Sequence, residues 1–164
     1  MTADVEDLAG ELEAANDEAI AFVQSCGDGP WTTMVEGEGW TVGVVLHHIA
    51  PGHGQMVDWI GHVRRGHDIA KTASEIDADN AGHALEFADV DRGTTRDELR
   101  IEGAALAALI RGLSADELVT TAAFGPGNGM EVTVEQLAPV AVRHCRTHLA
   151  DARRALESGA PPHK

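Results

Sequence analysis

Apolar residues recur at alternating spacings of three and four along much of this chain, and this period constrains its fold more than any other feature. Such spacing places the apolar side chains on one face of an α-helix. No segment shows the alternation and flanking turns of a β-hairpin, and we expect no strand. The sequence therefore predicts an all-α fold, a four-helix bundle. Its helices are expected at residues 4–26, about 41–65, 95–113 and about 134–157.

Residues that begin or bend helices support these bounds. Thr95 with Glu98, and Thr133 with Gln136, have the spacing of a capping box, in which the two side chains satisfy the first backbone N–H groups of a helix. Pro51 lies within the second segment. Because proline has no N–H and its ring crowds the carbonyl one turn earlier, we expect a kink there.

Two of the connections are long. Residues 66–94 join the second helix to the third, and part of this stretch, residues 76–88, could hold a short helix. Residues 114–131 join the third helix to the fourth and contain the turn-rich sequence GPGNG at 125–129. Long crossover connections mean that a simple up-down-up-down order is not required. The length of 164 residues fits a single domain over residues 1–164.

The charge of the chain argues against several kinds of partner. Asp and Glu number 27 against 12 Lys and Arg, which gives a formal net charge of −15. Such a surface repels phosphate backbones and anionic lipids, so we expect no nucleic-acid and no membrane partner. The first residues have neither the basic region nor the apolar stretch of a signal peptide. Cys26 and Cys145 form no disulfide framework, and we expect a cytoplasmic protein.

The chain contains nine histidines, and two of them have a metal-binding spacing. His144 and His148 are four residues apart, so their imidazoles lie one turn apart on the same helix face. Two imidazoles in this arrangement can bind one metal ion, as they do in the HExxH helix of metalloproteases. The intervening glutamate of that motif is absent here, so the spacing alone leaves coincidence as an alternative.

Helix geometry separates the adjacent pair His47 and His48. With about 100° between successive residues, His48 lies on the flank of its apolar stripe, as do His144 and His148 on theirs. His47 falls roughly opposite the stripe, so we expect it to face solvent. Three histidines from two helices suit Zn²⁺, Ni²⁺ or Fe²⁺, and three protein ligands leave the open position that is typical of a catalytic metal.

Other polar residues near these histidines have two interpretations. His53 could be a further ligand or a packed core histidine, and we favour packing. Asp151 could add an oxygen ligand or orient an imidazole, or it could pair with Arg154 at the surface. The remaining histidines are expected to be solvated surface residues: His62, His67, His83 and His163.

One segment resembles a known family. Residues 39–50, GWTVGVVLHHIA, are similar to the W-(S/T)-V-x-x-V-L-x-H-(L/I)-A motif of the DinB-like (YfiT-like) four-helix-bundle superfamily. That superfamily includes the metal-binding domain of mycothiol-dependent maleylpyruvate isomerase. The motif histidine corresponds to His48, and the late HxxxH pair of the family corresponds to His144 and His148. Trp31 and the segment 79–81 (Asp-Asn-Ala) resemble further recurring features.

The resemblance implies a bundle of unusual helix order, with a divalent metal ion held by His48, His144 and His148, and it implies a homodimer. It also implies chemistry on a small molecule, either thiol-cofactor-dependent transfer or isomerisation, or metal-dependent hydrolysis. The sequence does not contain the additional C-terminal domain that accompanies the isomerase bundle, so isomerisation of maleylpyruvate is not the expected activity.

The attacking group is expected to come from outside the protein. The sequence offers no Ser-His-Asp or Cys-His arrangement, and Cys145 lies within an apolar stripe. A metal-bound water or thiol would then be the nucleophile. We therefore expect an S-transferase-like enzyme with a low-molecular-weight thiol, mycothiol or bacillithiol, as cosubstrate. Arg143 and Arg146 could provide positive potential for an anionic thiol, or they could be solvated surface residues.

Two alternatives stay open: a metal-dependent hydrolase, and a non-catalytic, stress-related helical binding module. An open metal position beside a pocket would favour an enzyme. Trp31, Trp40 and Trp59 could line such a pocket near His48, or they could pack in the core. Asn80 could hydrogen-bond near the site or cap a helix.

Overall fold

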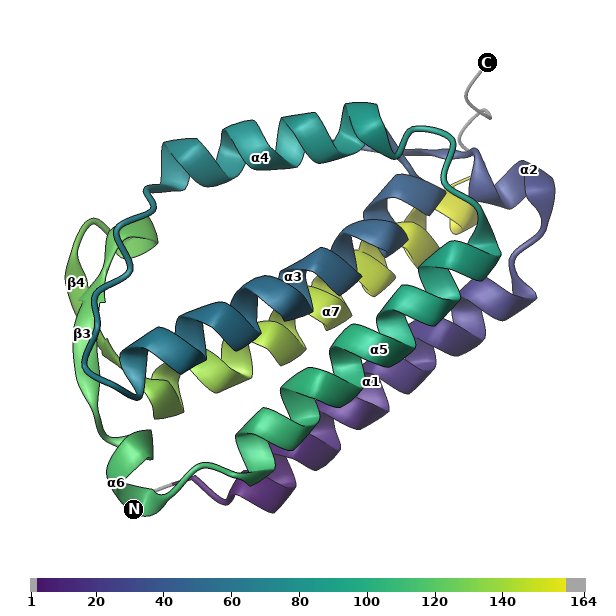
Figure 1. Ribbon diagram of the computed structural model, residues 1–164. Coiled ribbons are helices and arrows are strands. Elements are labelled where there is room, and N and C mark those ends of the chain that lie inside the picture. Colours follow the sequence, from purple (N-terminus) through teal and green to yellow (C-terminus); the bar gives the residue numbers. More distant parts are fainter. Residues whose placement is uncertain (1–2, 159–164) are drawn as a thin grey trace.

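The computed structural model describes residues 3–158; the ends of the expected domain 1–164, with His163, lie outside the described residues. The chain is mostly helical, as expected, with short strands between the helices (Figure 1). The elements follow in the order α1 (Val5–Ser25), α2 (Asp28–Trp31), β1 (Met34–Val35), β2 (Trp40–Thr41), α3 (Val42–Val63), α4 (Ala73–Glu86), α5 (Arg92–Arg111), α6 (Ala115–Leu118), β3 (Thr121–Phe124), η1 (Gly125–Gly127), β4 (Met130–Thr133) and α7 (Val134–Glu157).

Four long helices form the predicted bundle, and their order is not up-down-up-down. α5 packs between α1 and α3, and α7 packs against α3 and α1 (Figure 1). Arg111 at the end of α5 pairs with Glu6 at the start of α1, so these two helices are antiparallel. His47 and Glu98, both near the beginnings of their helices, make a hydrogen bond between α3 and α5, which run parallel. The long connection containing α4 makes this parallel crossover possible.

The apolar stripes predicted from the sequence form the core. Burial of these side chains is the main favourable contribution to the stability of the bundle. Small residues let α1 approach α5 closely, as where Asn16 lies against Gly103. The largest fully buried apolar side chains come from all four long helices: Leu12, Val23, Leu46, Ile49, Ile60, Leu99, Leu106, Ile110, Leu137 and Leu149.

The helix ends confirm one capping box and correct the other. Thr133 and Gln136 form the predicted box at the start of α7. α5 begins earlier than expected, because the side chain of Asp91 caps it by accepting a hydrogen bond from the backbone N–H of Thr94. Thr95 therefore lies inside the helix, where its hydroxyl donates to the carbonyl of Asp91. α3 continues through Pro51 as one helix from Val42 to Val63.

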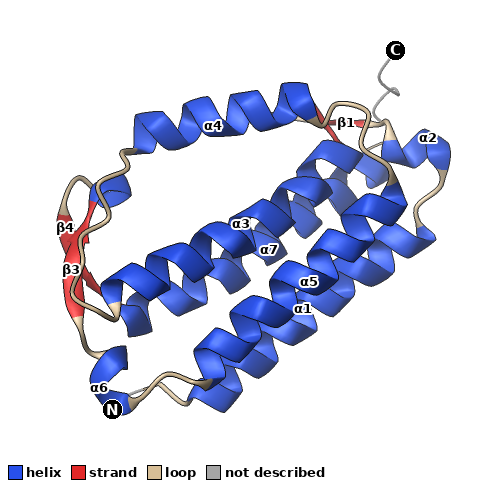
Figure 2. Ribbon diagram, viewed as in Figure 1, coloured by secondary structure: helices blue, strands red, loops and turns tan. Residues whose placement is uncertain are grey.

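The expectation that the chain has no strands is wrong. β1 pairs with β2 and β3 pairs with β4, both antiparallel (Figure 2). β1 and β2 have two residues each, too few to show an alternating pattern. β3 and β4 are joined at the predicted turn, where Asn128 and Gly129 adopt positive φ angles of 57° and 78°. Asn and Gly tolerate this conformation at little cost.

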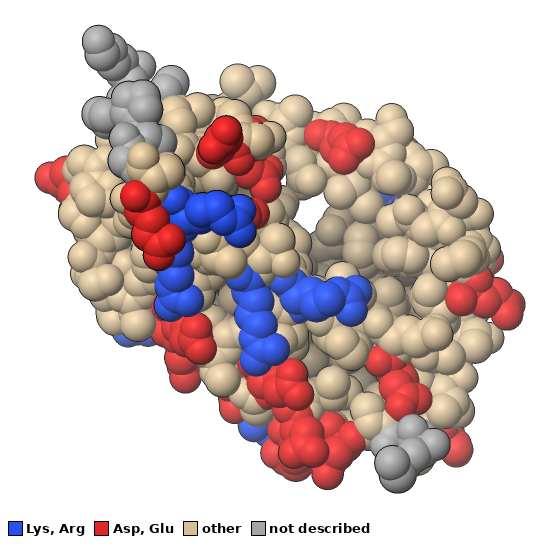
Figure 3. Space-filling model, turned by 180° about the vertical axis from the view of Figure 1, so that it is seen from behind, with Lys and Arg blue, Asp and Glu red and all other residues tan. Residues whose placement is uncertain are grey.

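α4 fills the first long connection and lies apart from the bundle. It covers most of the segment where a short helix was expected, and the capping box of Thr72 and Glu75 begins it. No residue of α4 is buried. The helix spans one side of the bundle above α3 (Figure 1), and the space-filling view shows a hollow in the molecule (Figure 3). Among the described residues, none of the helices combines the length and the apolar character that a membrane span requires.

Candidate metal centre

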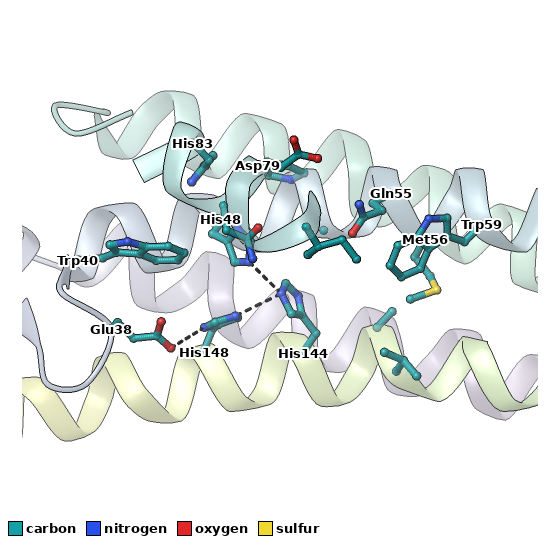
Figure 4. Close-up of a pocket in the computed structure, with 16 residues that line it drawn as sticks. Glu38, Trp40, His48, Gln55, Met56, Trp59, Asp79, His83, His144 and His148 are labelled. Atoms are coloured by element: carbon teal, nitrogen blue, oxygen red, sulfur yellow. Dashed lines mark hydrogen bonds and ion pairs between the residues drawn. The ribbon is translucent and has the colours of Figure 1, made fainter. Parts of the chain in front are cut away.

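The structure brings together the three histidines that the sequence singled out. His48 comes from α3, and His144 and His148 come from α7 (Figure 4). The Nε2 atom of His144 lies 3.1 Å from that of His48 and 3.2 Å from that of His148. All three rings can offer a nitrogen within 4.8 Å of the others. Binding of a metal by these residues stays a prediction, to be tested by experiment.

The spacing of these nitrogens fits a metal ion. Two nitrogens bound to zinc at tetrahedral angles, each about 2.0–2.1 Å from the ion, lie about 3.4 Å apart. The observed separations of 3.1 and 3.2 Å are close to this value. A divalent ion between the three rings would accept all three converging lone pairs. Without an ion, each Nε2 atom of a neutral imidazole is either a hydrogen-bond donor or an acceptor, so the three rings cannot all satisfy one another.

Burial keeps the histidines of this cluster in the form that binds metal. Burial, together with the neighbouring His148, lowers the pKa of His48 and of His144 to about 3. The pKa of His148 is also lowered by burial, although Glu38 and Asp151 oppose this shift. The three imidazoles are therefore neutral at pH 7, with their lone pairs available to a cation.

Glu38 and Asp151 lie behind His148. Glu38, in the turn between β1 and β2, places its Oε1 atom 3.9 Å from Nδ1 of His148. That Nδ1 atom is buried and has no hydrogen-bond partner among the described residues. Carboxylates commonly orient metal-binding histidines from this position. The carboxylate of Asp151 is close to both, but it also makes the expected pair with Arg154, at 3.0 Å.

Gly52 makes room for His144. A Cβ atom built on this glycine would lie 2.6 Å from Cε1 and 2.9 Å from Nδ1 of the His144 ring. These separations are too short for real contacts, and the ring cannot move without leaving the other two histidines. Position 52 therefore has to be glycine if His144 is to keep its place in the cluster.

Replacing Gly52 by alanine is expected to weaken zinc binding about 10- to 100-fold, the effect usually seen when a residue that orients a ligand is lost. Titration against a chromophoric chelator would measure the affinity. Gly61→Ala in the same helix is the matched control, since its nearest neighbour, Nη2 of Arg65, would be 3.9 Å from the new Cβ. Equal affinities of the two variants would contradict the role of Gly52.

His47 does not face solvent, so that expectation is wrong. Its side chain is fully buried, its Nε2 is 2.6 Å from a carboxylate oxygen of Glu98, and its Nδ1 is 2.7 Å from Nε2 of His83. The ring of Phe87 stacks on it at a centroid distance of 4.2 Å. The face opposite the apolar stripe of α3 is covered by α5 and the end of α4, which a single-helix argument could not include.

His83 also differs from expectation. It was expected to be a solvated surface residue, but it is half-buried against His47, and desolvation lowers its pKa to about 4. Three other described histidines outside the cluster behave as predicted. His53 is fully buried and its Nε2 lies 3.1 Å from Oδ1 of Asn16, so it packs in the core. His62 and His67 are exposed.

A cavity of about 440 Å³ opens beside the three histidines and lies under α4 (Figure 4). This size is typical of sites for small molecules. Trp40 and Trp59 line the cavity, as one of the two interpretations proposed. Trp31 instead packs in the core and donates a hydrogen bond from Nε1 to the carbonyl of Val90. Asn80 lies within α4 and lines the cavity, so it does not cap a helix.

The charged residues of the cavity are acidic. Glu38 and Asp79 line it, and no Lys or Arg is among the described residues that do. Arg143 and Arg146 are exposed and do not contribute to its walls; Arg146 pairs with Glu11 of α1 at 3.6 Å. Figure 3, which views the molecule from behind Figure 1, shows basic side chains interspersed with acidic ones on that face. The two arginines therefore do not provide positive potential inside the cavity.

Neither cysteine offers a nucleophile at this site. Cys145 is buried between the helices, where desolvation raises the pKa of its thiol to about 12. The pKa of the half-buried Cys26 is raised as well. Since the thiolate is the reactive form of cysteine, both thiols are inert near neutral pH.

Comparison with known proteins identifies the family and the fold. The model of the DinB superfamily matches residues 11–152. YfiT from Bacillus subtilis, described as a probable metal-dependent hydrolase with an unusual four-helix bundle topology, is 19% identical, with a TM-score of 0.76 over 94% of this chain and 86% of that one. A mycothiol-dependent maleylpyruvate isomerase is 13% identical, with a TM-score of 0.70 over 91% of this chain and 60% of the isomerase. No curated protein matches the sequence.

Proposed function

The chain belongs to the DinB superfamily, and on this basis we propose that it is a divalent-metal-dependent enzyme that acts on a small molecule. The metal ligands in this proposal are His48, His144 and His148. One observation carries it: three neutral imidazole nitrogens converge beside a cavity of about 440 Å³. Three protein ligands with a neighbouring cavity leave room for a substrate, which favours an enzyme over a non-catalytic binding module.

The residues around the cluster have distinct tasks in this proposal. His48, His144 and His148 would hold a divalent ion, which would lower the pKa of a water or thiol and so supply a nucleophile at neutral pH. Glu38 orients the ring of His148, and Gly52 allows His144 to approach. Trp40, whose ring lies 5.4 Å from that of His48, covers the cluster on one side and limits the access of water.

For the reaction, we propose transfer of a low-molecular-weight thiol to an electrophile. None of the described residues that line the cavity carries a thiol or hydroxyl nucleophile, so a second small molecule fits the site. Mycothiol carries no carboxylate, whereas bacillithiol and glutathione do. Asp79 is paired with Lys71, but Glu38, beside His148, would repel a carboxylate, and no Lys or Arg is among the described residues that line the cavity. We therefore favour mycothiol as the cosubstrate.

The test is conjugation of monochlorobimane by metal-loaded protein with mycothiol, bacillithiol or glutathione. We expect catalysis with mycothiol, a lower rate with the two anionic thiols, and no rate above background for His48→Ala. Folding of the variant is checked by circular dichroism. If wild type and variant give the same rate with all three thiols, thiol transfer is wrong.

Hydrolysis is the second candidate, supported by the fold shared with YfiT, a probable metal-dependent hydrolase. The absence of a protein nucleophile in the described cavity is compatible with water as the attacking group. Hydrolysis of p-nitrophenyl acetate by wild type and by His48→Ala would test it. A protein that binds metal but shows neither activity would instead fit the binding module.

Three expectations from the sequence stay predictions. They are the single domain over residues 1–164, the homodimer and the cytoplasmic location. Sedimentation of the purified chain would test the dimer.

A further inference from the structure

We propose that the cavity accepts an elongated, amphipathic substrate, with its reacting group at the three histidines and an apolar tail at the opposite end. The tail would occupy an apolar slot formed by Met56, Trp59, Ile76 and Val140. This inference rests on the proposed metal-dependent function and adds the class of substrate.

The slot and the three histidines belong to one continuous cavity. On the antiparallel α7, Val140 is four residues from His144, or about 6 Å along the helix axis, so the slot begins one turn from the cluster. On α3, His48 and Trp59 are eleven residues apart, or about 16 Å, so the slot extends well away from it. Figure 4 shows the same separation, with Glu38 and Trp40 near the histidines and Met56 and Trp59 at the far end.

The two ends of the cavity differ in chemistry. Near the histidines the walls include carboxylates and further polar side chains, and Gln55 and Asn80 contribute amides along its length. The slot itself is made of aliphatic, thioether and indole groups. Trp59 is fixed in place by Phe124 of β3, whose ring meets it edge-on at a centroid distance of 5.0 Å. An aromatic wall held in this way gives the slot a defined shape.

The slot also has apolar surface that the protein itself leaves partly uncovered. Trp59, Ile76 and Val140 are only partly buried and line the cavity, and Trp59 and Val140 also pack against the edge of the core. Ile76 reaches the cavity from α4, whose other large apolar residue, Leu85, is 83% exposed and lies outside this cavity. Apolar surface that lines a cavity is stabilised when an apolar ligand displaces water from it. A substrate with an apolar tail would do this while its reacting group reaches the histidines.

A series of alkyl hydroxamates tests the inference, because the hydroxamate binds zinc and only the tail varies. Calorimetric titration of the zinc-loaded full chain would compare acetohydroxamate, butanohydroxamate, hexanohydroxamate and octanohydroxamate. We expect the affinity to rise up to about fourfold for each added methylene until the slot is filled. Ile76→Asp should remove this rise, while acetohydroxamate, which is too short to reach the slot, should still bind.

Leu85→Asp is the matched control on the same helix, and it should keep the chain-length dependence of wild type. Because no residue of α4 is buried, neither change threatens the core. If acetohydroxamate binds but longer tails bind no more tightly, the slot is wrong and the metal site stands. If the rise persists in Ile76→Asp, the tail lies elsewhere and the inference is wrong. If no hydroxamate binds, the metal-dependent function fails and the slot fails with it.

Discussion

Replacing His144 by alanine is expected to lower the affinity for zinc by more than about 100-fold, beyond the usual effect of losing a residue that only orients a ligand. His144 is the central member of the cluster, with its Nε2 3.1 and 3.2 Å from the other two Nε2 atoms. His48→Ala should have a comparable effect, because two remaining imidazoles cannot complete the site. Metal analysis and competitive titration of protein purified without a His-tag would measure the metal content and the affinity. We expect about one ion per chain for wild type only.

Two other histidines make this prediction specific. His67→Ala changes an exposed residue outside the cluster and should leave zinc binding unchanged. His47→Ala is the sharper comparison, since His47 is the neighbour of His48 in the sequence but contacts Glu98 and His83. We expect this variant to lose stability and still bind one ion. Equal losses of affinity in His47→Ala and His48→Ala would contradict the assignment of the ligands.

Acidification of the metal-free protein from pH 7 to pH 5 is expected to remove much of its stability. Burial lowers the pKa of His48 and His144 to about 3 and that of His53 to about 4. In the unfolded chain these pKa values return to about 6.5, so the unfolded state binds more protons below that pH. The stabilising contribution of the neutral histidines is present above pH 6.5 and is lost as the pH falls toward 3–4.

The expected loss is large for a protein of this size. At pH 5 a single histidine with such a lowered pKa costs about 2 kcal/mol, so even one of them removes a large part of the stability. Typical domains are stable by about 5–15 kcal/mol in total. Urea unfolding at pH 7, 6 and 5 would measure the change, and zinc at pH 7 should add stability because it binds only the folded chain. A free energy of unfolding that is the same at pH 7 and pH 5 would contradict the burial of neutral histidines.

The bundle and its three-histidine cluster could be predicted from the sequence because both depend on helix periodicity. The apolar stripes of the four long helices define the core, and His48 lies on the flank of its stripe. The spacing of His144 and His148 places both rings on one face of α7 whatever the helix packs against. Helix geometry, with the one assumption that the histidine-bearing flanks of α3 and α7 face each other, is therefore enough to predict the three-histidine cluster.

Features that depend on contacts between distant segments could not be predicted in this way. His47 is buried because Glu98 and Phe87, far along the chain, cover it. The start of α5 depended on a choice between two caps, and Asp91 satisfies the backbone one turn before Thr95. The importance of Gly52 follows only from the position of His144 on another helix. In each case the pattern of residues within one helix contains no information about the distant residue that contacts it.

The cavity itself depends on α4, whose role the sequence left open. The helix has little apolar surface and buries no residue, so its pattern predicts no packing partner. Its ends are held instead by separate contacts, the pairing of Ile69 with Phe124 before the helix and the hydrogen bond of His83 near its end. Between these points α4 forms the wall that turns a helix surface into a cavity.

We propose that His48, His144 and His148 bind one metal ion through their Nε2 atoms. A crystal structure of the zinc-loaded protein, with anomalous diffraction recorded at the zinc edge, would locate the ion directly. We expect a single anomalous peak about 2.0–2.1 Å from each of the three Nε2 atoms, with the remaining coordination position facing the cavity. A peak that places the ion at Glu38 and Asp151 instead, or the absence of a peak at the three histidines, would contradict this assignment of the ligands.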